Sequence, residues 1–192
     1  GPWTYWYPDG HRMMTEQCDK DVCLSIDAWD RDGTQTLKNG EGFIRTWYPT
    51  GDTADVSHYH LGVQSGEERT YWPAGNLKAR GQWLGGAKHG KWEHWYSDSK
   101  RERTEHWSKG KLDGPFTTWF TNDTVNVEGF YLADKKDSTW MWYTTTGSKD
   151  ILGHFKNDLQ DGLWKYWYPN GQMSSIGLYR NGQQEGEWLY YY

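Results

Sequence analysis

Glycine and aromatic residues recur at a fixed interval of 24 residues from residue 42 to the end of the chain, with no insertion or deletion. One column of this repeat is almost entirely glycine: Gly42, Gly66, Gly90, Gly114, Ser138, Gly162 and Gly186. Five residues further on, every unit carries a large aromatic side chain: Trp47, Tyr71, Trp95, Trp119, Tyr143, Trp167 and Tyr191. Such an interval is typical of a protein built from stacked copies of one small structural unit.

Each unit contains two aromatic-rich runs separated by turn residues. In residues 168–171, Pro169 fixes φ and Gly171 permits a positive φ, which together predict a tight turn. Where this glycine is absent from a unit, Ser or Asp takes its place, and Asp tolerates turn conformations. A second turn, at positions such as Asn181 and Gly182, passes the chain to the next unit. The runs between these turns predict two antiparallel strands per unit.

We therefore expect an all-β fold, an elongated repeat array of antiparallel β-hairpins that forms one twisted, curled single-layer sheet and one continuous repeat domain. Residues 42–192 form its regular part, whose last unit is incomplete. Residues 3–41 carry the pattern less regularly, and we interpret them as a cap of atypical repeats. The alternative for this segment is an insertion specific to a partner. Residues 1–2 resemble the scar of a protease cleavage.

Because side chains alternate across a strand, the repeat places rings on both faces of the sheet. Trp164 and Tyr166 share one face, and Lys165 and Trp167 share the other. A flat sheet with rings on both faces would be insoluble, so we expect it to curl and bury at least one row. Equivalent residues of neighbouring hairpins lie roughly 9.5 Å apart, too far for their rings to stack directly. We expect another column to fill these gaps: Tyr59, Trp83, Trp107, Tyr131, Phe155 and Tyr179.

Two interpretations of the aromatic columns remain open. In the first, all of them are core, and the rings supply most of the stability. In the second, the row from Trp47 to Tyr191 stays exposed on a concave face and contacts a partner, because its face also carries polar residues such as Arg45 and Lys165. We assign structural roles to two other sets: the glycines Gly66, Gly90, Gly114, Gly162 and Gly186, and the rings Trp83, Trp107, Tyr131 and Tyr179.

Composition changes this picture in two ways. Aromatic residues make up 18% of the chain, including 15 Trp and 14 Tyr, so ring rows can replace the sparse aliphatic residues as a core. The formal net charge is −5, and no basic run occurs. Since nucleic acids and anionic membranes are bound largely through Lys and Arg, neither is an expected partner. No apolar stretch approaches the roughly 20 residues of a membrane span, so we expect no direct membrane insertion.

Few residues suggest a disulfide, a metal site or a catalytic site. Cys18 and Cys23 could form a local disulfide or remain free thiols, and further ligands at zinc-site spacing are missing. His58 and His60 share one face of a predicted strand with only Asp55 nearby, which favours a solvated edge over a metal site. No catalytic triad motif or phosphate-binding loop is present. We expect no catalytic residue, no metal and no cofactor, and therefore no enzyme.

The repeat resembles the MORN-repeat superfamily, specifically its bacterial variant with Tyr-x-Asn-Gly turns. The resemblance is clearest from Gly162 to Gly171 and continues through residues 177–182 to Trp188. It covers nearly the whole chain, in about nine units. The units are richer in Trp and slightly longer than the eukaryotic pattern. The resemblance implies an antiparallel sheet used for protein–protein contact, with relatives described as immunity or antitoxin proteins and others associated with the cell envelope.

The expected function is a non-enzymatic scaffold whose aromatic-lined face binds another protein, either a toxin or an envelope or structural component. One alternative is an immunity protein that neutralises a toxin by binding it. A second is a carbohydrate- or choline-binding module, since aromatic cages hold quaternary ammonium groups. Residues 187–192 form a strand without a partner, which favours self-association through that edge. The sequence does not fix the compartment. The resemblance favours the bacterial envelope or the exterior, or the cytoplasm for an immunity protein.

Overall fold

A computed structural model describes all residues from Gly1 to Tyr192 and contains only strands and turns. The chain forms two compact units, residues 1–89 and residues 90–192. Unit 1 contains β1 (Pro2–Trp6), β2 (Arg12–Asp19), β3 (Val22–Trp29), β4 (Gln35–Lys38), β5 (Glu41–Trp47), β6 (Thr53–His60), β7 (Val63–Tyr71) and β8 (Leu77–Leu84). The chain passes from the first unit to the second within β9 (Ala87–Trp95).

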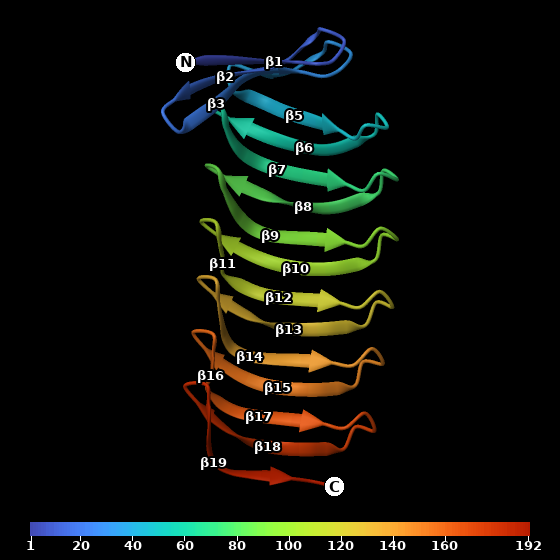
Figure 1. The fold of residues 1–192 in the computed structure, drawn as a ribbon, viewed down its shortest axis with the longest axis vertical. Coiled ribbons are helices and arrows are strands. Elements are labelled where there is room, and N and C mark those ends of the chain that lie inside the picture. Colours follow the sequence, from blue (N-terminus) through green and yellow to red (C-terminus); the bar gives the residue numbers. More distant parts are fainter. The chain divides into compact units, whose positions relative to one another are not determined.

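Unit 2 contains the end of β9 and ten further strands: β10 (Arg101–Ser108), β11 (Lys111–Leu112), β12 (Gly114–Trp119), β13 (Val125–Leu132), β14 (Lys135–Tyr143), β15 (Lys149–Lys156), β16 (Leu159–Gln160), β17 (Gly162–Trp167), β18 (Met173–Arg180) and β19 (Gln183–Tyr190). All pairings in both units are antiparallel and join strands that are close in the sequence, as in β5–β6 and β17–β18 (Figure 1). The expected all-β hairpin array is therefore confirmed. No helix is present that could cross a membrane.

The first turn of each hairpin repeat has the same hydrogen bonds throughout the chain. In the turn after β5, the N–H of Tyr48 donates to the carbonyl of Asp52 at 2.8 Å, and the N–H of Gly51 donates to the carbonyl of Tyr48 at 2.9 Å. Gly51 has a φ of 100°, and the residues that replace this glycine elsewhere, Ser99 and Asp123, have φ values of 68° and 67°. The turn therefore keeps its shape where glycine is lost, as the sequence predicts.

The second turn places two successive residues in the left-handed region. Asn181 and Gly182 have φ values of 50° and 82°, and Ala133 and Asp134 have 49° and 72°. Two positive φ values in a two-residue loop are the signature of a type I′ turn, whose twist matches that of the flanking strands. Short connections of this kind keep each strand beside its sequence neighbour.

Phenol groups tie successive hairpins together in each unit. The hydroxyl of Tyr48 donates to the carbonyl of Tyr71 at 2.6 Å, within unit 1. In unit 2, Tyr96 donates to the carbonyl of Trp119, and Tyr168 to that of Tyr191, both at 2.8 Å. Each bond spans 23 residues and so joins one turn to the first strand of the next hairpin. Tyr48, Tyr96 and Tyr168 occupy the same position in their repeats and therefore form part of an inter-repeat hydrogen-bond ladder.

Unit 2 has an aromatic core on one face of its sheet, which we call the core face. Trp140 and Trp164 are 1% and 4% exposed. Phe155 lies between them, with ring centres 6.1 Å and 5.3 Å away. On the paired strand a glycine faces each of these tryptophans, and a Cβ added at Gly153 would lie 2.5 Å from the ring of Trp164. The rings thus lie flat on glycine backbone, which is how a single-layer sheet buries them.

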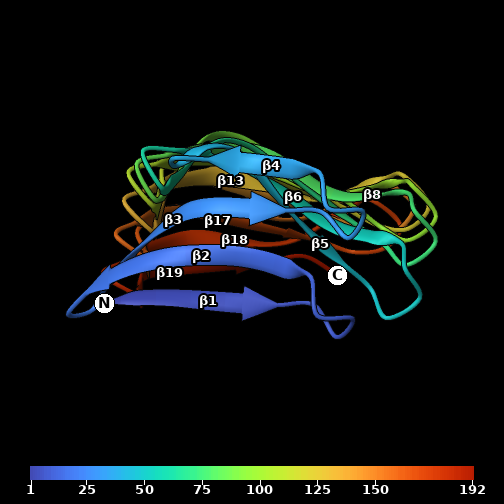
Figure 2. The same cartoon turned by 90° about the horizontal axis from the view of Figure 1, so that it is seen from above.

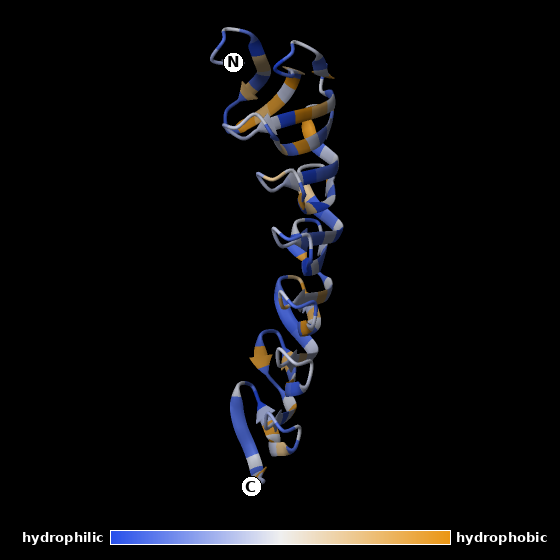
Figure 3. Ribbon diagram, turned by 90° about the vertical axis from the view of Figure 1, so that its right-hand side faces the viewer, coloured by the Kyte–Doolittle hydropathy of each residue, from blue (hydrophilic) through white to orange (hydrophobic).

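Unit 1 has an aliphatic core. Ala28, Leu37 and Ile44 are buried against one another, and Met14 and Tyr59 pack on them. The hydropathy colouring of Figure 3 shows hydrophobic bands on the strands near the N-terminus. Strand β2, which contributes Met14, is arched rather than straight (Figure 2). This core lies mainly in the segment that the sequence predicts to be a cap, and that role remains a prediction.

Candidate interaction surface

Strand alternation separates two aromatic surfaces in each unit. In β17, Trp164 and Tyr166 belong to the core face, where Trp164 contacts Trp142, Phe155 and Tyr179. Trp167 and Lys165 point to the opposite face, which we call the row face. The bulge of this hairpin lies on β18, between Ser175 and Met173, so the alternation of β17 is not interrupted. By the same alternation, each ring residue of the expected row lies on the face opposite the core positions of its own strand.

In unit 2 the row rings are only partly covered. Trp95, Trp119, Tyr143 and Trp167 are half-buried, and Tyr191 is 43% exposed. Exposed cations lie over two of them. The guanidinium of Arg101 is 5.8 Å from the ring centre of Trp119, and the ammonium of Lys149 is 5.9 Å from that of Trp167. These distances are within the range of cation–π attraction.

Tyr143 differs from the other members of the row because its hydroxyl donates to the carboxylate of Glu128. Burial and this acceptor raise the pKa of Tyr143 to about 12, so the phenol stays neutral. Beside it, Pro115, Thr117, Thr139 and Met141 line an open hollow of about 390 Å³. The row face of unit 2 thus combines half-exposed rings with charged groups and a shallow depression.

In unit 1 the row comprises Trp47 and Tyr71. Arg31 and Arg45 lie 5.3 Å and 5.2 Å from the ring centre of Trp47, and Arg45 also pairs with the buried Asp30 at 3.0 Å. A second open hollow, of about 390 Å³, lies beside Tyr71 and is lined by Phe43, Arg45, Val56, His58, Glu67, Arg69 and Tyr71. Cationic side chains lie over a row ring on this surface, as they do in unit 2.

The sequence prediction missed a buried polar cluster on the core face of unit 2. Glu105 is 3% exposed and stands where the neighbouring hairpins have Gly129 and Gly153. Its carboxylate contacts Nε2 of His94 at 3.1 Å, accepts from the indole of Trp107 at 2.9 Å, and pairs with Arg103 at 3.0 Å. Burial by itself raises the pKa of Glu105. The bonds from His94 and Trp107 and the charge of Arg103 outweigh it and hold the pKa below its usual value.

A second missed cluster lies on the core face of unit 1. Glu68 occupies the column position of Trp164 and accepts from the amide of Gln64 at 3.0 Å and from the indole of Trp83. Asp55 lies close to it and accepts from Ser57 at 2.8 Å. Burial, together with the charge of Glu68, raises the pKa of Asp55 to about 6. The sequence feature that could have revealed this cluster is the carboxylate of Glu68, at a position that is aromatic or aliphatic in the other repeats.

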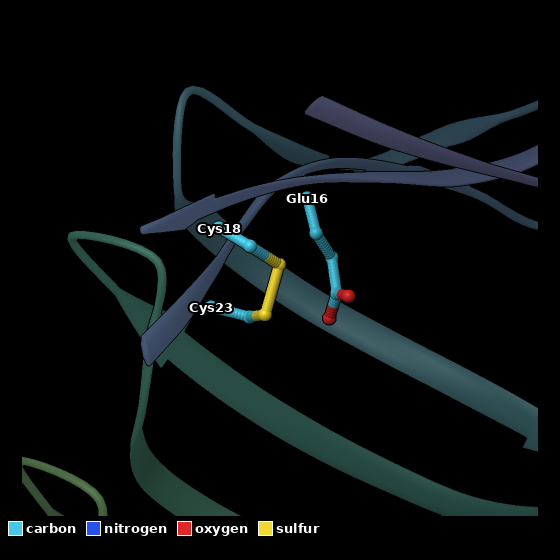
Figure 4. Close-up of side chains that lie close together, drawn as sticks. All are labelled: Glu16, Cys18 and Cys23. Atoms are coloured by element: carbon cyan, nitrogen blue, oxygen red, sulfur yellow. A yellow bond between two sulfur atoms is a disulfide. The ribbon is translucent and has the colours of Figure 1, made fainter. Parts of the chain in front are cut away.

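Cys18 and Cys23 are directly opposed on β2 and β3 and are joined by a disulfide (Figure 4). Glu16 lies on the same side, and its carboxylate accepts from Tyr5 at 3.0 Å. The bonded sulfur atoms offer no thiolate to a metal ion. The pair instead fixes the register of the β2–β3 hairpin one step from its turn.

The expected structural residues lie at defined places in their hairpins. Gly66, Gly90, Gly114, Gly162 and Gly186 all have positive φ. Three of them pack on a histidine of the paired strand, as Gly114 does on His106 and Gly162 on His154. Tyr131 and Tyr179 lie between core rings, with Trp140 5.1 Å from Tyr131 and Trp188 5.2 Å from Tyr179. Trp107 donates to the buried carboxylate of Glu105, and Trp83 donates to the half-buried carboxylate of Glu68.

Asp55, His58 and His60 do not form a metal site, because they do not share one face of the sheet. Asp55 is on the core face of β6, whereas His58 and His60 are on its row face. Nδ1 of His58 contacts the carbonyl of Glu67 at 2.7 Å, and Nδ1 of His60 contacts Glu41 at 3.0 Å. The two histidines thus have protein partners of their own.

No curated protein matches the chain. One similar chain of known structure comes from a structure described as "Crystal Structure of TcdB2-TccC3-Cdc42", with 7% identity and a TM-score of 0.26. The match covers 95% of this chain and 12% of that one. A likeness this weak carries no argument about fold or function. Two segments of the present chain, residues 64–84 and 160–181, match the family described as MORN repeat variant, which supports its resemblance to MORN-repeat proteins.

Proposed function

We propose that the protein is a non-enzymatic interaction scaffold that binds another protein through the row face. One observation carries the proposal: in unit 2 the core rings bury one another, whereas Trp119 and Trp167 remain half-exposed on the opposite face beneath Arg101 and Lys149. Rings that the fold does not need for its own core are free to contact a partner. MORN repeats commonly mediate interactions with proteins or membranes, which agrees with this use.

The side chains of the row face suit a protein partner. Trp, Tyr and Arg are the residues that contribute most often to the binding energy of protein interfaces. The two-strand spacing of successive rings, roughly 9.5 Å, lets neighbouring rings contact different side chains of one partner. No pair of groups on this face is arranged for acid–base or nucleophilic chemistry, so binding is the function that the geometry favours.

Alanine substitutions distinguish a binding role of the row rings from a structural role in the core. We expect Trp119→Ala and Trp167→Ala to weaken capture of a partner from the source cells, each by about tenfold, with a native circular dichroism spectrum. The matched control is Trp164→Ala on the core face of the same strand as Trp167, which should lower stability. Crosslinks from the partner should map to the row face. Unfolding of both row variants would instead assign the row to the core.

An immunity role is the second candidate, and the net charge of −5 favours it because an acidic protein is attracted to a basic toxin. Recovery of one small basic toxin whose activity is blocked would establish this role, and recovery of envelope or structural proteins would establish a scaffold. A carbohydrate- or choline-binding module, the other alternative, predicts saturable signals on a glycan array or in a choline titration.

A further inference from the structure

The chain itself holds an ammonium group inside an aromatic cage on the core face of unit 2. The ammonium of Lys136 lies 4.6 Å from the ring centre of Trp140, 5.2 Å from that of Phe155 and 5.6 Å from that of Trp142. All three distances are within the roughly 6 Å over which a cation is attracted to a ring face. Strand β14 supplies the lysine and both tryptophans, and β15 supplies the phenylalanine.

The same arrangement of rings recurs one repeat later in unit 2. Trp164 and Tyr166 are 6.1 Å apart at 30°, against 5.9 Å and 31° for Trp140 and Trp142. The third ring, Tyr179, is 5.5 Å from Trp164 at 67°, and in the first cage the corresponding separation is 6.1 Å at 77°. The repeat has therefore built a second cage with nearly the same geometry.

The second cage lacks the cation. Gln160 stands opposite Phe155 in β16, at the register position that Lys136 holds opposite Tyr131. A carboxamide brings no charge, and no Lys or Arg of unit 2 lies over the three rings. Burial, followed by the contact with Tyr179, raises the pKa of Tyr166 to about 12, so the phenol is neutral at physiological pH. The cage therefore offers a cation the faces of neutral rings.

We propose that Trp164, Tyr166 and Tyr179 form a binding site for an alkylammonium group supplied from outside the chain. The ligand takes the place that the stem and ammonium of Lys136 occupy in the first cage. The half-buried Tyr166 and Tyr179 form the rim. Because Trp164 is only 4% exposed, the ligand reaches its ring by displacing the side chain of Gln160. Methylated ammonium groups are favoured over a primary one because they lose less hydration on entering a ring-lined site. The site is on the core face and is independent of the proposed docking of a protein on the row face.

Titration of the whole chain with choline, followed by proton NMR, tests the proposal. We expect a saturable upfield shift of the ligand's methyl resonance at millimolar concentration, because the methyl groups lie over ring faces. The uncharged isostere 3,3-dimethylbutan-1-ol has the same shape, and we expect it to bind at least tenfold more weakly. Equal binding of the two would overturn the cation–π basis of the site, as would a choline titration without saturation.

Two substitutions at equivalent positions serve as matched controls. Gln160→Lys supplies an internal ammonium to the second cage, and we expect it to weaken choline binding at least tenfold. Lys136→Gln empties the first cage, and we expect the number of choline sites to rise from one to two. Both variants should keep the wild-type spectrum and cooperative unfolding. Unchanged binding in the folded Gln160→Lys variant would place choline elsewhere and contradict the assignment.

Parallel titrations identify the source of the ammonium group. Binding of Nα-acetyl-trimethyllysine methylamide would point to a modified lysine of a partner protein. Binding of choline with no response to the lysine derivative would point to a free quaternary ammonium compound. Absence of binding by both ligands would refute the proposal.

Discussion

At the scale of single residues, the glycines beneath the core tryptophans matter as much as the rings. Gly153 lies against the ring of Trp164, and Gly129 and Gly177 lie against Trp140 and Trp188 in the same way. A methyl group at any of these positions would occupy the space of an indole. Each core tryptophan thus lies against a glycine of the neighbouring strand, which has no side chain. This pairing lets a single-layer sheet bury an indole without a second layer of secondary structure.

Gly153→Ala should consequently destabilise unit 2. The added Cβ would lie 2.5 Å from two atoms of the Trp164 ring, so the ring must move out of its packed position. We expect a loss of about 1–3 kcal/mol in the free energy of unfolding, measured by urea denaturation. The control Thr117→Ala, on the row face, should cost far less. A Gly153→Ala protein as stable as the wild type would show that the ring does not rest on this backbone.

Asp55→Asn tests the half-buried acid of unit 1. Its folded pKa of about 6 lies above the ordinary value of 3.8, so the folded state holds the proton more tightly than the unfolded state. Asp55 therefore costs no stability below pH 4, an increasing amount between pH 4 and 6, and its full amount above pH 6. We expect Asp55→Asn to be more stable than the wild type by about 1–2 kcal/mol at pH 7.5, allowing for solvent screening, and equal to it at pH 4.

Thermal or urea unfolding of both proteins across this pH range measures the difference. The measurement at pH 4, where the two proteins should be equally stable, is the internal control. A difference between the two proteins that grows as the pH falls would show that the sign is wrong.

At the scale of the element, hairpins are joined by more than their strand ladders. The phenol of Tyr96 donates to the carbonyl of Trp119 in the next hairpin, and Phe120 stands at the equivalent position one repeat later without a hydroxyl. Asn122 instead donates from its side chain to the carbonyl of Thr145 at 2.7 Å. Different side chains thus make the same kind of connection at successive turns of unit 2.

We expect Tyr96→Phe to lower the free energy of unfolding by about 1 kcal/mol, because a partly buried hydrogen bond is lost with almost no change in shape. The reverse substitution, Phe120→Tyr, should cost nothing or stabilise by a similar amount, because it adds the missing donor. Chemical denaturation of both variants measures these effects. Destabilisation by Phe120→Tyr would indicate that the ladder does not extend to this turn.

At the scale of the whole molecule, two units with different cores carry the same repeat. Unit 1 is held by an aliphatic cluster with Met14 and Tyr59, and its β2–β3 hairpin is closed by the disulfide. Unit 2 is held by a continuous series of rings from Phe116 to Tyr190. In a repeat array each hairpin contacts mainly its neighbours, so stability is close to a sum of local terms.

Additivity within unit 2 follows from this architecture. Gly129 and Gly177 contact tryptophans that are two repeats apart, roughly 19 Å at the usual strand spacing. We expect the double variant Gly129→Ala, Gly177→Ala to lose the sum of the two single losses within about 0.5 kcal/mol in urea denaturation. A coupling energy above about 1 kcal/mol would mean that ring packing is transmitted along the whole series.

Most of the architecture could be predicted from the sequence, because turns and strand alternation depend on local chemistry. The two turn columns, the hairpin order and the residues that share a face follow from φ preferences and from a side-chain period of two. The polar clusters around Glu105 and Glu68 could not be predicted. In the sequence, a carboxylate in a glycine or tryptophan column is typical of a surface substitution. Only the structure shows that His94 and Arg103 surround Glu105 and that Trp83 donates to Glu68.

By itself, therefore, the sequence determined the all-β class, the 24-residue hairpin, its turns and the two sets of side chains that face opposite ways. The tertiary structure decided which rings are buried, because exposure depends on what the adjacent strand presents. Trp164 is buried since Gly153 lies beneath it, whereas Trp167, three residues later, stays half-exposed beneath Lys149. The tertiary structure also placed Lys136 among three rings. One of these rings comes from the neighbouring strand β15, and no local sequence pattern specifies that contact.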